Sequence, residues 1–524
     1  MSEPLRHECG VAALYLLDEA PGDGGAGSPD VPGGSVVGLL PTMLLNLQNR
    51  GQLAAGISTY KPGRAQLLDT YKAVGTVAEV FHTCQPERHR QLLEEYAGPA
   101  GIAHTRYATS GADDDRYAQP FERHHGRTWK WFAFAFNGTL ANYAELHDHL
   151  IRRRGYHISL DTDTEVIMHA LAYGLRGERM PDLRQVMAEV AASFDGAYNL
   201  VFLDAEGRLL VARDPHGFRP LHWALQGRLF GAASESVALS NVGFTAVHAL
   251  EPGQMALVER GKLRFARFAR AQGRSRCFFE WVYFANVASE IDGLSVYRSR
   301  AAAGRRLAEM EDCPPGDDCV VVPVPDTAKA AADSFAFHLR IPCMEGLIRN
   351  RYVGRTFIQP NSTRIDAARQ KYTPIPSVLE GRRVFLVEDS IVRSTTLRAL
   401  VQQMRARGRA RELHVRVACP PIVSPCFYGI DMSTLGELFA AAYLPGGRRG
   451  RLSARVLAEM AADLGVDSLR YLPVADLGAV IGCPQASLCT GCVTGRYPTP
   501  WGNRLLRLAR RNQALGITSR TYGS

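Results

Sequence analysis

The chain has 524 residues, of which 46% are hydrophobic and 22% are charged, and its formal net charge at pH 7 is +9. This composition is typical of a globular protein of two or three domains, and it excludes solenoid repeats and extended disorder. The arginines that carry the charge are scattered along the chain, which excludes a basic nucleic-acid-binding stripe and fits small anionic substrates.

The sequence shows neither a membrane-spanning segment nor an export signal, which indicates the cellular compartment. No stretch reaches the roughly 20 apolar residues that a membrane span requires, and the apolar run CGVAALYLL is not followed by a small-residue cleavage site. Eleven cysteines, an odd number, argue against a disulfide framework and favour buried, catalytic or metal-bound thiols. We therefore expect a cytoplasmic protein with no membrane and no nucleic-acid partner.

The first half of the chain mixes short strands and helices. The run CGVAALYLL predicts a strand, and residues 18–34, rich in glycine, proline and acids, predict a surface loop. From Ala54 to about Glu259, β-rich runs such as GIAHTRYAT, WFAFAFNG and AYNLVFLD alternate with helical stretches near YAELHDHLIRRRG and DTEVIMHALAYGL. This pattern predicts a layered α+β domain with its sheets inside.

After Cys277 the pattern changes to alternating strands and helices, with the apolar runs VVVPVP and VFLV and a helix from about Thr396. We expect a parallel-sheet α/β domain over residues 286–455 and a helical segment over residues 456–524. The basic stretch RLLRLARR in that segment is explained by a solvated helix face. The whole chain thus divides into a leader (1–8), a first domain (9–285), a second domain (286–455) and the C-terminal segment.

Cys9 lies where the short charged leader meets the first strand, which suggests that the leader is removed. If cleavage follows Glu8, the free α-amine of Cys9 has an unperturbed pKa of roughly 7.7 to 8.0 and can act as the base for its own thiol. Taken alone, such a cysteine is more often a small buried hydrophobe.

Six motifs around this cysteine change the interpretation. CGVAALY, LQNRGQLAAGI, GIAHTRYATSG, FNGTLANY, TDTEVIMHAL and ARDPHGFRPLHWA follow the order seen in class II glutamine amidotransferases, which about 250 residues resemble. The resemblance implies an Ntn-hydrolase αββα fold in which Cys9 attacks the glutamine amide. It assigns Arg106 to the glutamine α-carboxylate, Asp163 to its α-amine, and Asn137 and Gly138 to the oxyanion hole.

These roles suit the chemistry of the side chains. A guanidinium grips a carboxylate through two parallel hydrogen bonds, and an amide with a glycine N–H suits an oxyanion. The alternatives for the single motifs are an Asn-Gly turn at residues 137 and 138 and an ordinary surface ion pair for Arg106 and Asp163.

In the second domain, VFLVEDSIVRSTT runs from a strand through two acids into a helix start. Such a loop offers backbone N–H groups and hydroxyls to a phosphate, and the acids suit ribose hydroxyls or a magnesium ion; an ordinary capped βα turn has the same pattern. The segment resembles the binding signature for phosphoribosyl pyrophosphate (PRPP) of type I phosphoribosyltransferases. With LIRNRYVGRTFI and CFYGID, nearly the whole chain resembles the amidophosphoribosyltransferase family.

That resemblance implies glutamine and PRPP as substrates, Mg2+ as a cofactor, purine nucleotides as inhibitors, and a homo-oligomer, either dimer or tetramer. It assigns Glu388 and Asp389 to ribose and magnesium, and Thr327 of PVPDTAKAA to the metal. The segment from Arg349 to Gln359 is implied to close over PRPP and shield ammonia, which water would protonate. The loop assigned to the 5-phosphate comprises Ser390, Ile391, Val392, Arg393, Ser394, Thr395 and Thr396.

Cys489 and Cys492 form a CxxC pair, a spacing that lets two thiolates face one metal, although redox chemistry and coincidence give the same pattern. The resemblance adds Cys277 and Cys426 and implies a [4Fe-4S] cluster with a structural or oxygen-sensing role. Without the resemblance, four cysteines around a structural zinc are the expectation, and Cys483 is a competing ligand.

The sequence departs from the family at several positions. Leu53 and Phe136 stand where an aspartate and a histidine are usual, and neither is an assigned catalytic group. Glu388 replaces an aspartate, Ser394 replaces a glycine, and TAKA after Asp326 replaces a serine-glycine-threonine turn. These changes leave two alternatives open: a related glutamine-dependent transferase that acts on another phosphosugar, and a regulatory pseudoenzyme that binds PRPP or nucleotide without turnover.

Overall fold

The computed structural model describes residues 8–20, 31–107, 114–160, 162–350, 372–430, 432, 434–444, 452–517 and 521. Residues 1–7 of the predicted leader (1–8) and positions 351–359 of the predicted closing loop lie outside these residues, whereas Glu8, the last residue of the predicted leader, begins the first strand. Within the described ranges, no helix is both long and apolar enough to span a membrane.

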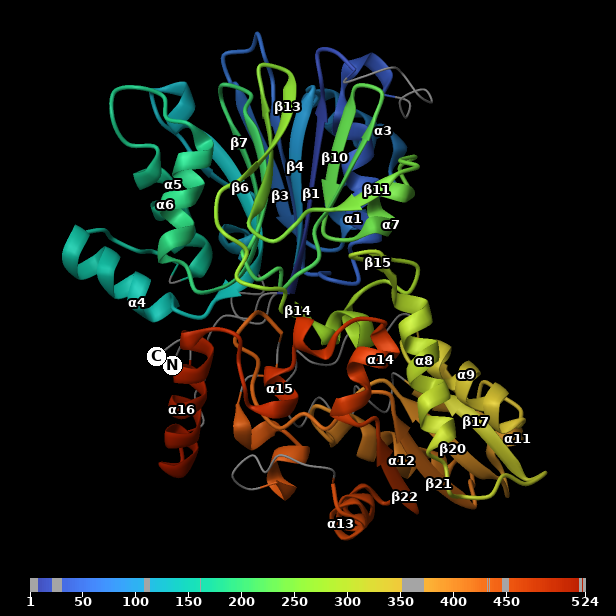
Figure 1. The fold of residues 1–524 in the computed structure, drawn as a ribbon. Helices are drawn as coiled ribbons and strands as arrows, with labels where there is room; N and C mark the ends of the chain where they lie inside the picture. The colour runs from blue at the N-terminus through green and yellow to red at the C-terminus, as the bar shows by residue number, and fades with distance from the viewer. Residues whose placement is uncertain are drawn as a thin grey trace.

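The N-terminal domain consists of two antiparallel sheets packed face to face (Figure 1). The strands of the first sheet are, in sheet order, β11 (Val247–Ala249), β9 (His222–Gln226), β10 (Leu229–Ala233), β1 (Glu8–Leu16), β4 (Ala100–Tyr107), β2 (Ala54–Tyr60) and β3 (Leu68–Val74). Those of the second sheet are β13 (Lys262–Arg267), β12 (Gln254–Glu259), β8 (Leu209–Arg213), β7 (Gly196–Asp204), β6 (Phe132–Leu140) and β5 (Phe121–Arg123).

Helices cover the outer face of each sheet, because successive side chains of a strand point to opposite faces. In β1, Val11 and Ala13 join the core between the sheets, whereas Ala12 and Leu14 belong to the core beneath the outer helices. The first sheet is covered by α1 (Leu40–Asn46), α2 (Val77–Val80), α3 (Pro86–Glu95) and α7 (Ser236–Ser240), and the second by α5 (Asp163–Gly174) and α6 (Leu183–Ser193), with α4 (Tyr143–Asp148) beside them. The predicted αββα layering is confirmed.

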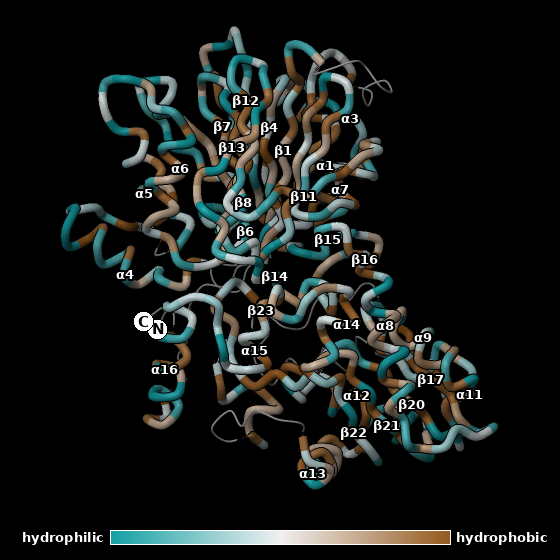
Figure 2. The backbone as a smooth tube through the Cα atoms, viewed as in Figure 1, coloured by the Kyte–Doolittle hydropathy of each residue, from teal (hydrophilic) through white to brown (hydrophobic). Residues whose placement is uncertain are grey.

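The second domain has a parallel sheet, as predicted. Its apolar strands are buried on both faces, which is typical of parallel sheets, and they run as brown segments inside the domain in Figure 2. The sheet order is β17 (Cys319–Pro323), β20 (Arg383–Glu388), β21 (Glu412–Val417) and β22 (Ser468–Tyr471). Around it lie α8 (Val296–Glu309), α9 (Lys329–Leu339), α11 (Pro376–Leu379), α12 (Thr395–Ala406), α13 (Ala454–Leu464), and the pair β18 (Leu347–Arg349) and β19 (Tyr372–Pro374).

The predicted boundary at residue 455 does not coincide with the edge of this sheet. Strand β22 lies in the segment predicted to be helical, and it pairs in parallel with β21. Its four residues are too short a run to show a strand period, so sequence reasoning missed it.

The two domains meet at short elements contributed by distant segments. The parallel pair β14 (Arg276–Cys277) and β23 (Leu488–Cys489) joins the end of the first domain to the C-terminal segment. The short helix η6 (Glu280–Phe284) follows β14 along the chain. The hairpin β15 (Glu290–Ile291) and β16 (Leu294–Ser295) then leads into α8, and the C-terminal segment continues through α14 (Leu477–Ile481), α15 (Gly491–Thr494) and α16 (Pro500–Ala514). The C-terminal segment thus packs back on the molecule, and Trp501 N–H donates to Asp195 of the first domain at 3.2 Å.

Candidate functional site

The predicted nucleophile lies beside the predicted glutamine ligand. Cys9 and Arg106 are direct partners in the antiparallel pairing of β1 with β4, and their exposed fractions are 1% and 3%. Burial lowers the pKa of Arg106, and a negative charge on Cys9 opposes this shift. A buried guanidinium is suited to grip the carboxylate of a ligand through two parallel hydrogen bonds.

The predicted oxyanion-hole residues lie on β6, in the facing sheet. The Oγ atom of Ser234 accepts hydrogen bonds from the N–H of Val11 at 3.0 Å and from Nδ2 of Asn137 at 3.4 Å, so one hydroxyl ties the strand of Cys9 to Asn137. Gly138 has φ +146°, and a Cβ there would lie 1.9 Å from the carbonyl oxygen of Ala197. The backbone at this position therefore requires glycine.

Asp163 begins α5, at the end of a loop that is held by side-chain caps. The Thr162 hydroxyl accepts the N–H of Glu165, and the Glu165 carboxylate accepts the N–H groups of Ser159 and Leu160. Val166 of the same helix shares a core with Phe136 of β6. The structure thus packs the helix that carries Asp163 against the strand that carries Asn137 and Gly138.

A cavity of about 150 Å³ lies over the carboxyl ends of β17 and β20 in the second domain. Ligands bind at this edge in open α/β sheets. The predicted PRPP residues that line it are Thr327, Glu388, Asp389, Ser390, Ile391, Val392, Arg393 and Thr396, whereas Ser394 and Thr395 are not among the lining residues.

The acid pair and the phosphate loop are held in place by local contacts. Asp389 is 7% exposed and accepts the Ser390 hydroxyl at 2.6 Å, and Arg393 donates to Glu437 at 2.8 Å. Ser394 has φ −76°, in the right-handed region, and it occupies the position before the first residue of α12. Serine is therefore accommodated without strain where the family has glycine.

The cavity also reaches the first domain. Tyr107 lines it from the end of β4, next to Arg106 in the chain, and Phe279, Tyr283 and Phe284 line it from η6 and the residue before it. The two predicted sites are thus neighbours across the domain junction. Sequence reasoning missed these lining aromatics, although Tyr107 lies in the motif GIAHTRYATSG and the other three lie in the run FFEWVYFA.

The four predicted cluster cysteines converge at the same junction. Cys277 and Cys489 are direct partners in the β14–β23 pair, and the backbone carbonyl of Cys492 accepts the N–H of Val423, near Cys426. Burial raises the pKa of Cys277 to about 12, and burial and the other cysteines raise the pKa of Cys489 and Cys492. Cys426, Cys489 and Cys492 are buried and Cys277 is partly buried, and thiols gathered in this way suit a cationic metal centre, which binds the thiolate form.

The described residues do not contain a preformed ion site: within those ranges, no three histidine, cysteine, aspartate or glutamate side chains are arranged to hold a metal ion. Cys483 is partly exposed, next to the αL residue Gly482 that ends α14.

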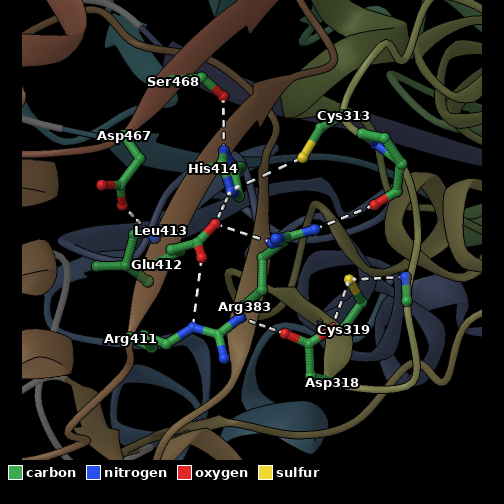
Figure 3. Close-up of polar contacts among 12 residues, drawn as sticks. Cys313, Asp318, Cys319, Arg383, Arg411, Glu412, Leu413, His414, Asp467 and Ser468 are labelled. Atoms are coloured by element: carbon green, nitrogen blue, oxygen red, sulfur yellow. Dashed lines mark hydrogen bonds and ion pairs between the residues drawn. The ribbon is translucent and has the colours of Figure 1, made fainter.

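Two other cysteines, Cys313 and Cys319, lie near His414 and Arg383 at the amino ends of the parallel strands (Figure 3). Cys313 Sγ lies 4.0 Å from Nε2 of His414, and Cys319 Sγ accepts the N–H of Gly316 at 3.2 Å. Because the cavity lies at the carboxyl ends of the same strands, these thiols are not part of it.

The comparisons with known proteins agree with this geometry. Residues 104–241 match the family model described as a glutamine amidotransferase domain. The chain is 39% identical over 502 residues to the amidophosphoribosyltransferase of Methanothermobacter thermautotrophicus, covering 95% of each chain, and 35% identical over 506 residues to that of Bacillus subtilis, covering 94% of this chain and 95% of the relative.

Among solved structures, the glutamine PRPP amidotransferase from B. subtilis, complexed with ADP and GMP, superposes with a TM-score of 0.77 at 33% identity, covering 94% of this chain and 98% of that one. A structure described as the allosteric regulatory enzyme of purine biosynthesis gives a TM-score of 0.78 at 34% identity, covering 94% and 96%.

Proposed function

Because the chain belongs to the amidophosphoribosyltransferase family, we propose that it converts PRPP, glutamine and water into 5-phosphoribosylamine, glutamate and pyrophosphate, the first committed step of purine synthesis. The observation that carries this proposal is the adjacency of the two sites: Arg106 lies beside Cys9, and the next residue, Tyr107, lines the cavity of Asp389. We therefore propose that ammonia released at the first site passes directly to the second and does not enter bulk water, where it would be protonated.

At the glutamine site, we infer that removal of residues 1–8 frees the α-amine of Cys9, which takes the thiol proton. The thiolate attacks the amide carbon of glutamine, and Asn137 and Gly138 stabilise the oxyanion. The α-ammonium then gives its proton to the amide nitrogen, and the C–N bond breaks to release ammonia and leave a thioester. Water then hydrolyses the thioester to glutamate. Arg106 and Asp163 hold the α-carboxylate and α-amine of the substrate during both steps.

At the second site, ammonia attacks C1 of the ribose and pyrophosphate leaves. The carboxylates of Glu388 and Asp389 bind the ribose hydroxyls, and the loop from Ser390 to Thr396 binds the 5-phosphate through N–H groups and hydroxyls. Glu388, Asp389 and Thr327 supply oxygen ligands suited to Mg2+, which neutralises the charge of the departing pyrophosphate when bound. We also propose that purine nucleotides inhibit the enzyme and that it forms a homo-oligomer.

The four cysteines fit a [4Fe-4S] cluster by their donor chemistry. They are thiols from three separate segments, held within electrostatic range of one another, and buried Arg219 lies near enough to Cys277 and Cys426 to interact with their charge. A positive guanidinium offsets the negative charge of thiolates around a metal centre. We propose that Cys277, Cys426, Cys489 and Cys492 hold the cluster and that its role is structural or oxygen-sensing.

We expect anaerobically purified protein to be brown and to contain about four iron and four sulfide per chain. Cys426→Ser should lower both the iron content and the thermal midpoint, because the ligands join three segments of the chain. The matched control is Cys84→Ser, at an exposed cysteine of the first domain, which should leave both unchanged. If the protein contains stoichiometric zinc and no iron, the iron-sulfur assignment is wrong, but the assignment of the four cysteines as metal ligands is retained.

An assay that follows glutamate and pyrophosphate together tests the activity itself. With PRPP and glutamine, we expect equal release of both products, because each ammonia is used once. Release of glutamate without pyrophosphate, restored by a different phosphosugar, would favour the related transferase. Release of neither product by protein that begins at Cys9 would favour the pseudoenzyme.

A further inference from the structure

The ring of Tyr117 lies over the guanidinium of Arg106, the residue assigned to the glutamine α-carboxylate. The distance from Cζ of Arg106 to the ring centroid is 5.1 Å. A cation within about 6 Å of the centroid is attracted to the ring, because the ring face carries partial negative charge. Tyr117 therefore offsets part of the cost of burying Arg106, which is 3% exposed.

An aromatic ring differs from a carboxylate as the partner of an arginine that must bind a substrate. Contact with the ring face uses none of the in-plane N–H donors of the guanidinium, whereas an ion pair does use them. Arg50, which is also 3% exposed, donates to Glu235 at 2.6 Å and to Glu280 at 2.7 Å. Tyr117 instead stabilises the charge of Arg106 without competing with a ligand carboxylate for the same donors.

The short helix η3 (Asp115–Tyr117) holds the backbone of Tyr117 through a side-chain cap at Asp114. The Asp114 carboxylate accepts the N–H of Arg116 at 2.9 Å and its Nε at 2.8 Å. The Tyr117 N–H donates to the carbonyl oxygen of Asp114 at 3.3 Å. Tyr117 thus leaves a turn that is fixed by its own hydrogen bonds.

The two residues after Tyr117 are anchored to strands of both sheets. Nζ of Lys72 in β3 donates to the carbonyl oxygen of Ala118 at 2.7 Å. Oε1 of Gln119 accepts the N–H of Phe136 in β6 at 2.8 Å, and β6 also carries the residues assigned to the oxyanion hole. The ring of Tyr117 is therefore held relative to the strands that form the glutamine site.

We propose that Tyr117 is a positioning residue for glutamine binding: its ring orients the Arg106 guanidinium so that two parallel N–H groups face the α-carboxylate of glutamine. This inference rests on the proposed function. The α-carboxylate does not change during the attack on the side-chain amide, so the contact contributes equally to substrate and transition-state binding. Tyr117 therefore sets the KM for glutamine and has little effect on kcat.

The test is the kinetics of pyrophosphate release by the whole enzyme, with glutamine varied at saturating PRPP. Leucine fills part of the space of Tyr117 but has no ring face. We expect Tyr117→Leu to raise the KM for glutamine roughly three- to tenfold and to change kcat less than about twofold, because one cation–π contact is lost. Tyr117→Phe keeps the ring and should restore both constants to within about twofold of the unsubstituted enzyme.

A donor without an α-carboxylate separates positioning from a general loss of packing. The α-amide of glutamine keeps the reacting side-chain amide and the α-amine but replaces the α-carboxylate by a neutral group. Tyr117→Leu should lower kcat/KM for glutamine and change kcat/KM for the α-amide less than about twofold. With added ammonia in place of either donor, the variant and the unsubstituted enzyme should release pyrophosphate at the same rate.

Tyr173→Leu is the matched control, because it removes another ring that contacts arginines in the same domain. The Tyr173 ring centroid lies 3.6 Å from Cζ of Arg154 and 4.0 Å from Cζ of Arg176. Tyr173 is near the end of α5 opposite Asp163, so its loss should leave the KM for glutamine unchanged.

An unchanged KM for glutamine in Tyr117→Leu would overturn the inference, as would an equal rise in Tyr117→Phe, because the ring would then not be the cause. An equal fall in kcat/KM for glutamine and its α-amide, or an equal rise in KM in Tyr173→Leu, would overturn it by showing a general loss of packing. Failure of the unsubstituted enzyme to release pyrophosphate with glutamine would instead count against the proposed function.

Discussion

Cys9→Ala is expected to lower glutamine-dependent synthesis by about a thousandfold or more, because no other group can form the thioester. The same variant should still make product from added ammonia, since the PRPP cavity lies in the second domain and Cys9 does not line it. The measurement is pyrophosphate release with glutamine and, separately, with an ammonium salt at a pH where free ammonia is abundant.

The matched control for this variant is Cys84→Ala, which removes an exposed thiol from the same domain and should change neither rate. Loss of both rates in Cys9→Ala would contradict a design with two separate sites. Intact mass spectrometry of the active enzyme belongs to the same experiment, because full activity in a chain that retains residues 1–8 would show that Cys9 does not act through its own α-amine.

Asp389→Asn is expected to lower kcat/KM for PRPP by roughly 10- to 100-fold, because a hydrogen bond to a charged group contributes about 1.5 to 3 kcal/mol. The carboxylate is 7% exposed in the cavity wall, so water screens it little, and asparagine keeps its shape while removing its charge. Steady-state kinetics with PRPP varied at saturating ammonia measure this step without the glutamine site.

Hydrolysis of glutamine in the absence of PRPP should change less than threefold in the same variant, because Asp389 belongs to the second domain. Asp463→Asn is the control: this carboxylate pairs with Arg398 near the surface of that domain, away from the cavity, and its loss should have little effect. Unchanged PRPP kinetics in Asp389→Asn would refute the assignment of the acid pair.

The layering of both domains could be predicted from the sequence because their central strands are continuous apolar runs. The runs of β1 and β17 reflect burial of both faces of each strand. Strand β22 could not be predicted, since its position at the edge of the sheet depends on pairing with β21 and not on its own four residues. Because β22 was missed, the predicted boundary at residue 455 falls before the last strand of the parallel sheet.

For the site, motifs identified the residues assigned to chemistry but not the contacts that hold them. Ser234 joins Val11 to Asn137 across two sheets, and neither neighbour is close to it in sequence. Glu280, which is buried and pairs with Arg50 and Arg219, did leave a signal. It is the single charged residue in the run FFEWVYFA, and a lone charge among aromatic residues is usually buried with a partner. Which arginines pair with it depends on tertiary packing.

The pairing of β14 with β23 also bears on how the molecule is made. Arg276 contacts Ser487 across 211 positions of the chain, so this junction closes only after nearly all of the chain has left the ribosome. The first domain, whose strands all precede residue 268, can fold while the rest is being synthesised. Closure of so long a loop is slow and requires both domains to have formed. The contacts between the domains are therefore expected to be the last part of the native structure to assemble.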